Sequence, residues 1–281
     1  TVSPVVFGGE ELDVCLAMLD AGTQDSFGLT SMPILGVTAP LDWHAAWAQA
    51  LAETVGGAIA FEALGARDIS ICTALYPADM RTSGLVFGSP EHVLITLTEA
   101  RVNGEILGNP RRAAKALYTS EKEPGTLAAT DKAIHTLAAL AAGYSSVTSV
   151  GVLGIDEVFC PEQVLLDLEI VDYARHIVRF SPDGPADIPE KDGLELIREG
   201  LNCPGHYIGT LSTAERFRAF YWSPTFFDRR LTAGWLSKPF QATAEAYAAA
   251  RTLADSYNYE LREDKKRALR NVLDTASVQL V

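Results

Sequence analysis

Apolar runs of strand length alternate with long helical stretches over the first 180 residues. The strand candidates are 2–7, 27–35, 69–75, 104–107 and 145–153, and helices are expected at about 10–20, 40–64, from 89–91 onward, 128–142 and 161–180. This alternation is typical of βα units around a parallel sheet. Thr38 and Pro40 are expected to begin the second helix, because a Thr hydroxyl satisfies a free N–H and proline lacks one. We therefore predict an α/β fold.

The length of the units indicates a TIM-type (β/α) barrel. Five strands in about 155 residues correspond to roughly 31 residues per unit, the spacing of a (β/α)8 barrel. Five strands are too few to close one, so we predict an N-terminally truncated or partial barrel, with outer helices, right-handed crossovers and strands in sequence order. Residues 1–182 should hold the βα units. Residues 183–281, with short helices and a weak strand at 206–208, should form a helical C-terminal part that packs on the same barrel.

The open edges of such a sheet require cover. Two edges would leave backbone N–H and C=O groups unpaired, and parallel strands such as 69–75 and 145–153 read as apolar on both faces. We therefore expect the later helices and a partner chain, or a short extra element, to fill the gap.

Composition and charge exclude several partners. The 281 residues hold 23 Lys and Arg against 36 Asp and Glu, a net charge of −13, which argues against nucleic acid or an anionic membrane surface as partner. The four cysteines are far apart and form no C-x-x-C pair, so we read them as buried thiols in a reducing compartment. No run of about 20 apolar residues and no basic-then-apolar leader is present. We expect a soluble, cytoplasmic protein.

The loops after the strands should hold the site, as in other α/β barrels. They contain no G-x-S-x-G, H-E-x-x-H, P-loop or helix-opening G-x-G-x-x-G, so hydrolase, zincin, kinase and dinucleotide functions lack their motifs. The long loop 108–125 is expected to act as a lid that orders on substrate binding. Asp79 and Arg81 would hold a substrate carboxylate or each other. Cys203 and His206 have a C-x-x-H spacing, but two ligands are too few for zinc, and no metal site is predicted.

Five blocks of sequence, in order, resemble the trimethylamine methyltransferase superfamily. They are Asp79-Met80-Arg81-Thr82 with Phe87-Gly88-Ser89-Pro90-Glu91; Pro161-Glu162-Gln163-Val164 through Asp167 and Glu169; Pro204-Gly205-His206-Tyr207-Ile208-Gly209; Thr213 with Phe217-Arg218; and Phe226-Phe227-Asp228-Arg229-Arg230. The resemblance implies a corrinoid-dependent methyltransferase with a TIM barrel, in which a methylated amine or betaine gives a methyl group to Co(I) of a separate corrinoid protein. The corrinoid (cobalamin) would be carried by that partner and not bound tightly by this chain.

Two departures from the family pattern refine this expectation. Family members extend further at the N-terminus, so this chain resembles their C-terminal part, from about the third or fourth strand onward. Trimethylamine-specific members carry pyrrolysine near the long loop, whereas this sequence has none there. The departure favours a quaternary amine or a betaine as substrate.

The implied chemistry needs few proton-transfer groups. A quaternary ammonium leaves as a neutral tertiary amine, so the enzyme must align the N–CH3 bond with cobalt, exclude water, and hold the cation with aromatic rings and carboxylates. We assign Tyr76, Tyr118, Phe159 and Tyr207 to an aromatic cage, with ordinary packing as the alternative for each. Asp79 and Glu157 would balance the ammonium, Arg81 or Lys122 would bind a betaine carboxylate, Asn109 is a further substrate-binding candidate, and His206 joins Asp79 and Glu157 as a catalytic candidate.

Two other functions stay open. The chain could be a non-catalytic binding or assembly subunit, a truncated barrel that pairs with another chain or with a copy of itself. An unrelated barrel lyase is the third possibility, to be preferred if the loop carboxylates coordinate a metal.

Overall fold

The computed structural model describes residues 3–109, 113–181, 184–185 and 192–279. Within these ranges the helices are α1 Glu10–Asp20, α2 Trp43–Ala63, α3 Pro90–Arg101, α4 Thr126–Ala141, α5 Pro161–Val178, α6 Gly193–Asn202, α7 Leu211–Phe220, α8 Thr232–Ser237, α9 Ala242–Ser256 and α10 Glu263–Gln279, with a π-helix η1 at Val102–Ile106 and a 3-10 helix η2 at His206–Gly209. The strands are β1 Ser26–Thr30, β2 Asp68–Cys72, β3 Ala78–Asp79, β4 Gly84–Leu85, β5 Ala113–Ala114, β6 Ser146–Val147, β7 Val152–Leu153, β8 Val158–Phe159, β9 Phe180–Ser181 and β10 Gly184–Pro185.

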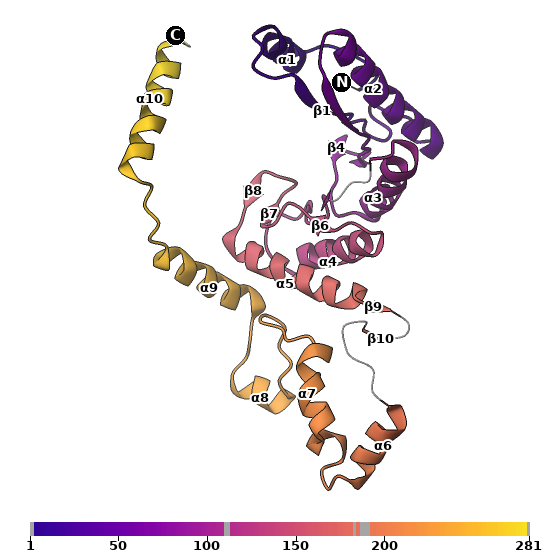
Figure 1. Cartoon of the computed structure of the whole chain (residues 1–281), viewed down its shortest axis with the longest axis vertical. Helices are drawn as coiled ribbons and strands as arrows, with labels where there is room; N and C mark the ends of the chain where they lie inside the picture. The colour runs from indigo at the N-terminus through magenta and orange to yellow at the C-terminus, as the bar shows by residue number, and fades with distance from the viewer. Residues whose placement is uncertain (1–2, 110–112, 182–183, 186–191, 280–281) are drawn as a thin grey trace.

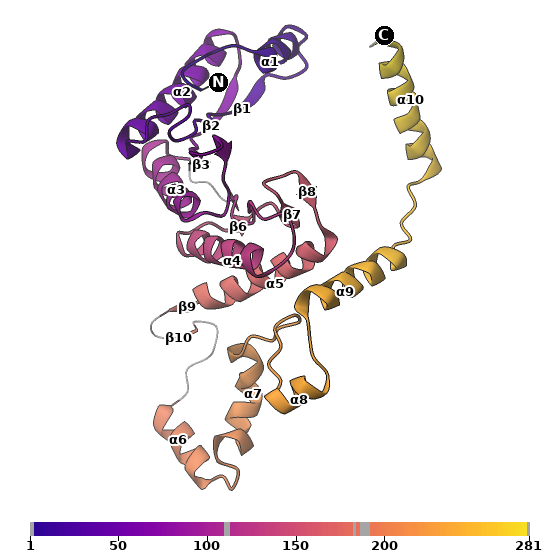
Figure 2. The same cartoon turned by 180° about the vertical axis from the view of Figure 1, so that it is seen from behind.

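Two parallel strand pairs confirm the predicted mixed α/β class. β1 pairs with β2, with Phe27 opposite Ile69, and β5 pairs with β6, while β3–β4, β7–β8 and β9–β10 are short antiparallel pairs. Helices α2 to α5 follow one another in chain order along one side of these strands, and α1 lies on the other side of β1 from α2 (Figures 1 and 2). Across the described ranges the strands form two-stranded sheets and no closed barrel, so the TIM barrel stays a prediction.

Several predicted elements are wrong in detail. Residues 104–106 belong to the π-helix η1, which continues α3, and 206–208 lie in the 3-10 helix η2. In the strand predicted at 2–7, residues 3–5 form a turn, and Val2 lies outside the described residues. One of the short later helices was expected over 189–199, and its first residues, 189–191, also lie outside the described residues. The strand predicted at 145–153 divides into β6 and β7 at Ser149 and Gly151, whose φ angles are positive.

Helix starts depend on which side chain reaches a free N–H. Ser89 accepts a hydrogen bond from the N–H of His92 and caps α3, as predicted. The prediction for α2 is wrong, because Asp42 is its cap and Thr38 instead accepts from the N–H of Ile34 in the preceding turn.

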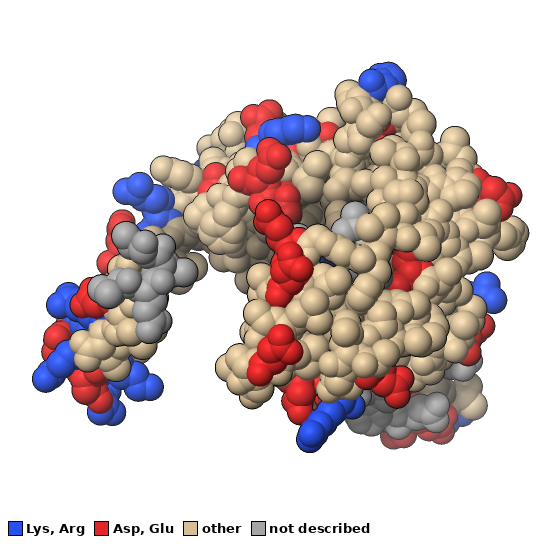
Figure 3. All heavy atoms as spheres, turned by 90° about the horizontal axis from the view of Figure 1, so that it is seen from above, with Lys and Arg blue, Asp and Glu red and all other residues tan. Residues whose placement is uncertain are grey.

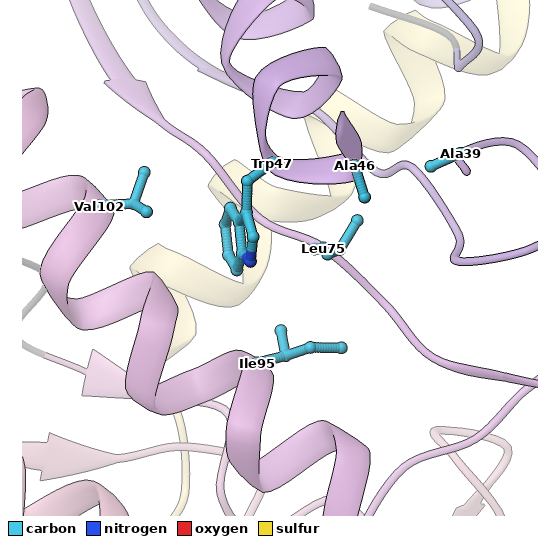
Figure 4. Packing of buried hydrophobic residues seen from close by; sticks show 6 residues of the cluster. All are labelled: Ala39, Ala46, Trp47, Leu75, Ile95 and Val102. Atoms are coloured by element: carbon cyan, nitrogen blue, oxygen red, sulfur yellow. The ribbon is translucent and has the colours of Figure 1, made fainter. Parts of the chain in front are cut away.

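The apolar core between α2 and α3 sits against the chain that follows β2. Its buried members are Ala39, Ala46, Trp47, Leu75, Ile95 and Val102. Figure 4 shows Trp47 of α2 pointing toward Ile95 of α3, with Leu75 beside both. Ala46 and Ile95 are fully buried. This packing fixes the segment that carries Tyr76 at the end of β2.

A buried ion pair joins α4 to α5. The Nζ of Lys132 lies 2.7 Å from Oδ2 of Asp167, and both side chains are 0% exposed. Asp167 also accepts hydrogen bonds from the Gly151 N–H and from Nε2 of Gln163, each at 2.7 Å. Burial lowers the pKa of Lys132 and raises the pKa of Asp167. The carboxylate thus connects two helices with the turn before β7.

The later helices contact the βα part through α5, against which α9 packs. In both views α10 extends away from the rest of the molecule (Figures 1 and 2). Seen from above, α10 carries most of the visible Lys and Arg, whereas Asp and Glu predominate elsewhere on this face (Figure 3). The division at residues 182 and 183 stays a prediction.

Two further sequence predictions concern the state of the cysteines and membrane-spanning helices. None of the four cysteines forms a disulfide within the described residues; Cys160 is buried and the other three are half-buried. Among the described residues, no helix combines the length and the apolar character needed to cross a membrane.

Candidate functional site

An aromatic cluster lies where β2 and β5 end. Tyr76 follows β2 and is buried, with its ring centroid 5.8 Å from that of Phe87. Tyr118 lies on the other side, with its centroid 4.8 Å from Phe87, and Ile155 packs against the same group. We call Tyr76, Phe87, Tyr118 and Ile155 the Phe87 cluster. The structure thus brings two of the four predicted cage residues together, around a phenylalanine that sequence reasoning did not assign to the cage.

A lysine that the sequence analysis did not assign a role borders this cluster. Lys115 directly follows β5 and donates a hydrogen bond from Nζ to the Tyr76 hydroxyl, at 2.6 Å. Its side chain is half-buried. The bond joins the ends of two parallel strands, which is where α/β folds place ligands.

Two buried histidines support Phe87 from behind. The ring of His92 meets that of Phe87 edge-on at 4.8 Å and that of His135 at 4.5 Å. The Gly88 N–H donates to Nδ1 of His92, and Thr96 Oγ1 lies 2.7 Å from Nε2 of His135. Burial lowers the pKa of His92 to about 3 and that of His135 to about 4, and the nearby Lys115 charge adds to the effect on His92. Both rings are therefore neutral at neutral pH.

Asp79 and Arg81 bind each other. They lie at the β3–β4 hairpin, where the Arg81 guanidinium contacts both Asp79 oxygens, at 3.1 Å from Nε and 2.8 Å from Nη2. The Arg81 N–H adds a bond of 2.9 Å to the same carboxylate. These hydrogen bonds lower the pKa of Asp79 to about 2. Of the two roles left open by the sequence, mutual pairing is the one that the structure shows.

Three other predicted residues, Lys122, Glu157 and Phe159, are exposed. The Nζ of Lys122 donates to the Ser120 carbonyl at 2.6 Å. Glu157 is exposed in the turn between β7 and β8. Phe159 is 68% exposed, and its ring lies against Gly151. Phe159 shares no ring contact with the Phe87 cluster among the described residues, so the four-residue cage is not assembled.

Part of the long loop predicted at 108–125 is buried in the core. Asn109 donates from Nδ2 to the Ile71 carbonyl at 2.7 Å, which holds the start of the loop beside β2. Further along, Leu117 and Thr119 are fully buried. Residues 113–119 therefore belong to β5 and the packing that follows it, and the ordering of 108–125 on substrate binding stays a prediction.

His206 and Tyr207 lie in a different region. Both are exposed in η2, where the Tyr207 ring lies against Gly200 of α6. In both views α6 and α7, which flank η2, are well separated from β7 and β8 (Figures 1 and 2). The structure therefore does not bring these two residues to the strand ends, because the chain leaves the βα part after α5.

The later sequence blocks supply mainly structural contacts. Glu169 of α5 accepts hydrogen bonds on Oε1 from the N–H groups of Thr225 and Phe226, at 2.7 and 2.8 Å. Asp228 and Arg230 form a local ion pair at 2.6 Å. These contacts fix the turn after α7 on α5.

A second aromatic group lies on this turn. The rings of Tyr173 and Phe227 are stacked, with centroids 5.6 Å apart, and Trp222 meets both edge-on. Trp222 donates from Nε1 to Asp172 at 2.5 Å. Two hollows of about 490 and 380 Å³ share Tyr221, Trp222 and Arg229 in their walls. Sequence reasoning assigned no role to this group, although Phe227 stands in the last of the five blocks. The dense Phe220-Tyr221-Trp222 run is the signal that was available.

A metal centre is not formed by the described residues. Nowhere within these ranges do three or more His, Cys, Asp or Glu side chains gather closely enough to hold an ion.

Comparison with known proteins places the chain in a family. It is 24% identical over 263 residues to the glycine betaine methyltransferase of Desulfitobacterium hafniense (strain Y51), a match that covers 92% of this chain and 52% of that relative. The chain thus spans about half the length of the curated relative that it matches. The family model described as trimethylamine methyltransferase (MTTB) matches residues 1–280, and the protein therefore belongs to the trimethylamine methyltransferase family.

Proposed function

We propose that this chain acts in transferring a methyl group from a methylated amine, a quaternary amine or betaine, to Co(I) of a separate corrinoid protein. The observation that carries the proposal is the family match over residues 1–280. The similar protein from Desulfitobacterium hafniense is named for glycine betaine, which supports a betaine as substrate class.

The Phe87 cluster suits a quaternary ammonium. Such a cation lacks N–H donors and is attracted to the faces of aromatic rings. Tyr76 and Tyr118 bring two rings to the ends of parallel strands, and Tyr118 is half-buried and so reachable. The neutral histidines behind Phe87 add no positive charge that would repel the substrate.

This chain's part in the reaction is to bind and orient the amine. The N–CH3 bond breaks with its electron pair left on nitrogen, so the amine departs neutral and needs no proton. The partner's corrinoid, when bound, supplies the nucleophile that accepts the methyl group. The aromatic rings would hold the remaining N-methyl groups so that one methyl faces outward, and they would exclude water from it.

A panel of amines tests this proposal. The chain is incubated with a reduced corrinoid protein and, separately, with glycine betaine, choline, trimethylamine and dimethylamine, while the visible spectrum of the corrinoid is followed. We expect methylation with quaternary substrates alone. Methylation by trimethylamine alone would refute the substrate class. If no amine methylates the corrinoid with this chain, while a version extended to the relative's full length is active, this chain is not the catalyst by itself.

A second candidate is an assembly chain. Within the described ranges β1 pairs with β2 alone, and a hollow of about 590 Å³ lined mainly by apolar residues lies between β1 and α1. A sheet edge of this kind is a template for another strand. Size-exclusion chromatography with light scattering, together with the methylation assay above, distinguishes the two candidates. An assembly chain would elute with a partner or a second copy, and it would methylate no corrinoid by itself.

A further inference from the structure

Lys115 is a half-buried cation without a carboxylate partner in the described part of the chain. Its Nζ makes a hydrogen bond to the neutral Tyr76 hydroxyl, at 2.6 Å, and no described Asp or Glu oxygen lies within 4.0 Å. A partly desolvated ammonium is usually compensated by an acidic group. This place at the end of β5 therefore favours an anion.

Arg81 and Lys122, which the sequence analysis assigned to a substrate carboxylate, each bind another group of the protein. Arg81 binds Asp79 through two side-chain contacts. Lys122 is exposed and bound to a carbonyl oxygen. A charge that water surrounds contributes little to binding, whereas the half-buried Lys115 is less screened.

Tyr76 connects Lys115 to the aromatic rings. Its ring belongs to the Phe87 cluster and its hydroxyl accepts from Lys115. In glycine betaine a single CH2 separates the trimethylammonium from the carboxylate. A site for this zwitterion must therefore place a cation directly beside an aromatic surface, and Tyr76 brings the two together.

We infer that Lys115, whose Nζ lies 5.1 Å from the centroid of the buried Tyr76 ring, binds the carboxylate of a betaine substrate while the half-buried ring of Tyr118 contacts its trimethylammonium group. The inference rests on the proposed function and refines its substrate class. The site selects zwitterionic betaines over amines that carry the same trimethylammonium without a carboxylate, such as choline. Lys115 is thus a specificity-determining residue that takes no part in proton transfer.

Binding of two probes tests this role without a corrinoid. Calorimetry measures the Kd of glycine betaine and of choline for the wild-type chain, for K115M and K115Q, and for the matched control K265M at an exposed lysine of α10. The wild type should bind glycine betaine at least about tenfold more tightly than choline, as expected for one charge-assisted hydrogen bond. K115M and K115Q should lose about tenfold or more for glycine betaine and stay within about twofold for choline. K265M should match the wild type.

The outcomes separate the two claims. Equal affinity of the wild type for both probes, unchanged by K115M or K115Q, would overturn the role of Lys115 and leave the methyltransferase proposal standing. Binding of neither probe would overturn the quaternary substrate class itself. Circular dichroism melting checks that each variant is folded. If K115M unfolds, K115Q, which still donates to the Tyr76 hydroxyl, and the wild-type preference decide the question.

Discussion

Replacing Lys132 by methionine should destabilise the protein more than any exposed Lys→Met change. Lys132 and Asp167 are both fully buried. Methionine has a similar length but no charge, so Asp167 would keep its hydrogen bonds from Gly151 and Gln163 and lose its counter-ion. Breaking a buried pair by removing one partner costs about 3–5 kcal/mol, because it leaves an uncompensated charge.

A second substitution isolates the charge. In K132M/D167N the charge is gone, and the Asn carbonyl oxygen still accepts from one of the two donors. We expect the double variant to recover at least about 1 kcal/mol relative to K132M, since the cost of an unpaired carboxylate exceeds that of one lost hydrogen bond.

Urea unfolding followed by tryptophan fluorescence and by circular dichroism measures these free energies, and coincident transitions justify a two-state treatment. K122M is the control, and its exposed position should keep the change within about 0.5 kcal/mol. A K132M variant within about 1 kcal/mol of the wild type, or a double variant less stable than K132M, would refute the reasoning.

Two further predictions concern pH and backbone conformation. In the folded protein the pKa of His92 is about 3 and that of His135 is about 4, both below the ordinary value of 6.5. Unfolding below about pH 6.5 therefore takes up protons. The free energy of unfolding is full above about pH 6.5 and falls as the pH drops toward the two folded-state values. The urea midpoint of the wild type should be lower at about pH 5 than at about pH 7.5. Equal midpoints at the two pH values would contradict the conclusion that His92 and His135 are buried in the neutral form. Gly151→Ala should cost at least about 1 kcal/mol more than Gly22→Ala. Both glycines have positive φ, but an added Cβ meets Val164 at Gly151 and nothing within 4 Å at Gly22; equal urea midpoints would show that the contact is relieved by side-chain motion.

The start of α3 and the longer parallel pair were predictable because local chemistry determines them. Ser89 followed by Pro90 caps α3 as expected, and the apolar runs at 27–35 and 69–75 overlap β1 and β2. β5 was missed because Ala113-Ala114 has neither a β-branched nor an aromatic residue. The strand predicted at 104–107 failed because Asn103, bonded to Thr73, keeps the chain helical there.

The buried ion pair was detectable in principle. Lys132 stands on the same stripe of α4 as the buried Ala128, His135 and Ala139, at spacings of three to four residues. A lysine in such a stripe requires a buried anion. The sequence analysis treated α4 only as a covering helix and did not ask where that charge goes.

The candidate site was only partly predictable. Tyr76 and Tyr118 were found from their positions near strand ends, but Lys115 follows Arg111 and Arg112 in a stretch that reads as a solvated charge run. Its contact with Tyr76 spans 39 positions. A pairing of that separation depends on how β2 and β5 are placed, which local patterns do not specify.

Stoichiometry of methyl transfer from glycine betaine tests the central claim most directly. A limiting amount of reduced corrinoid protein is mixed with this chain and excess glycine betaine, and dimethylglycine is measured by NMR beside the visible spectrum of the corrinoid. The account predicts one dimethylglycine for each corrinoid methylated, with none formed when either protein is omitted. Corrinoid methylation without dimethylglycine, or dimethylglycine formed without the corrinoid protein, would contradict it.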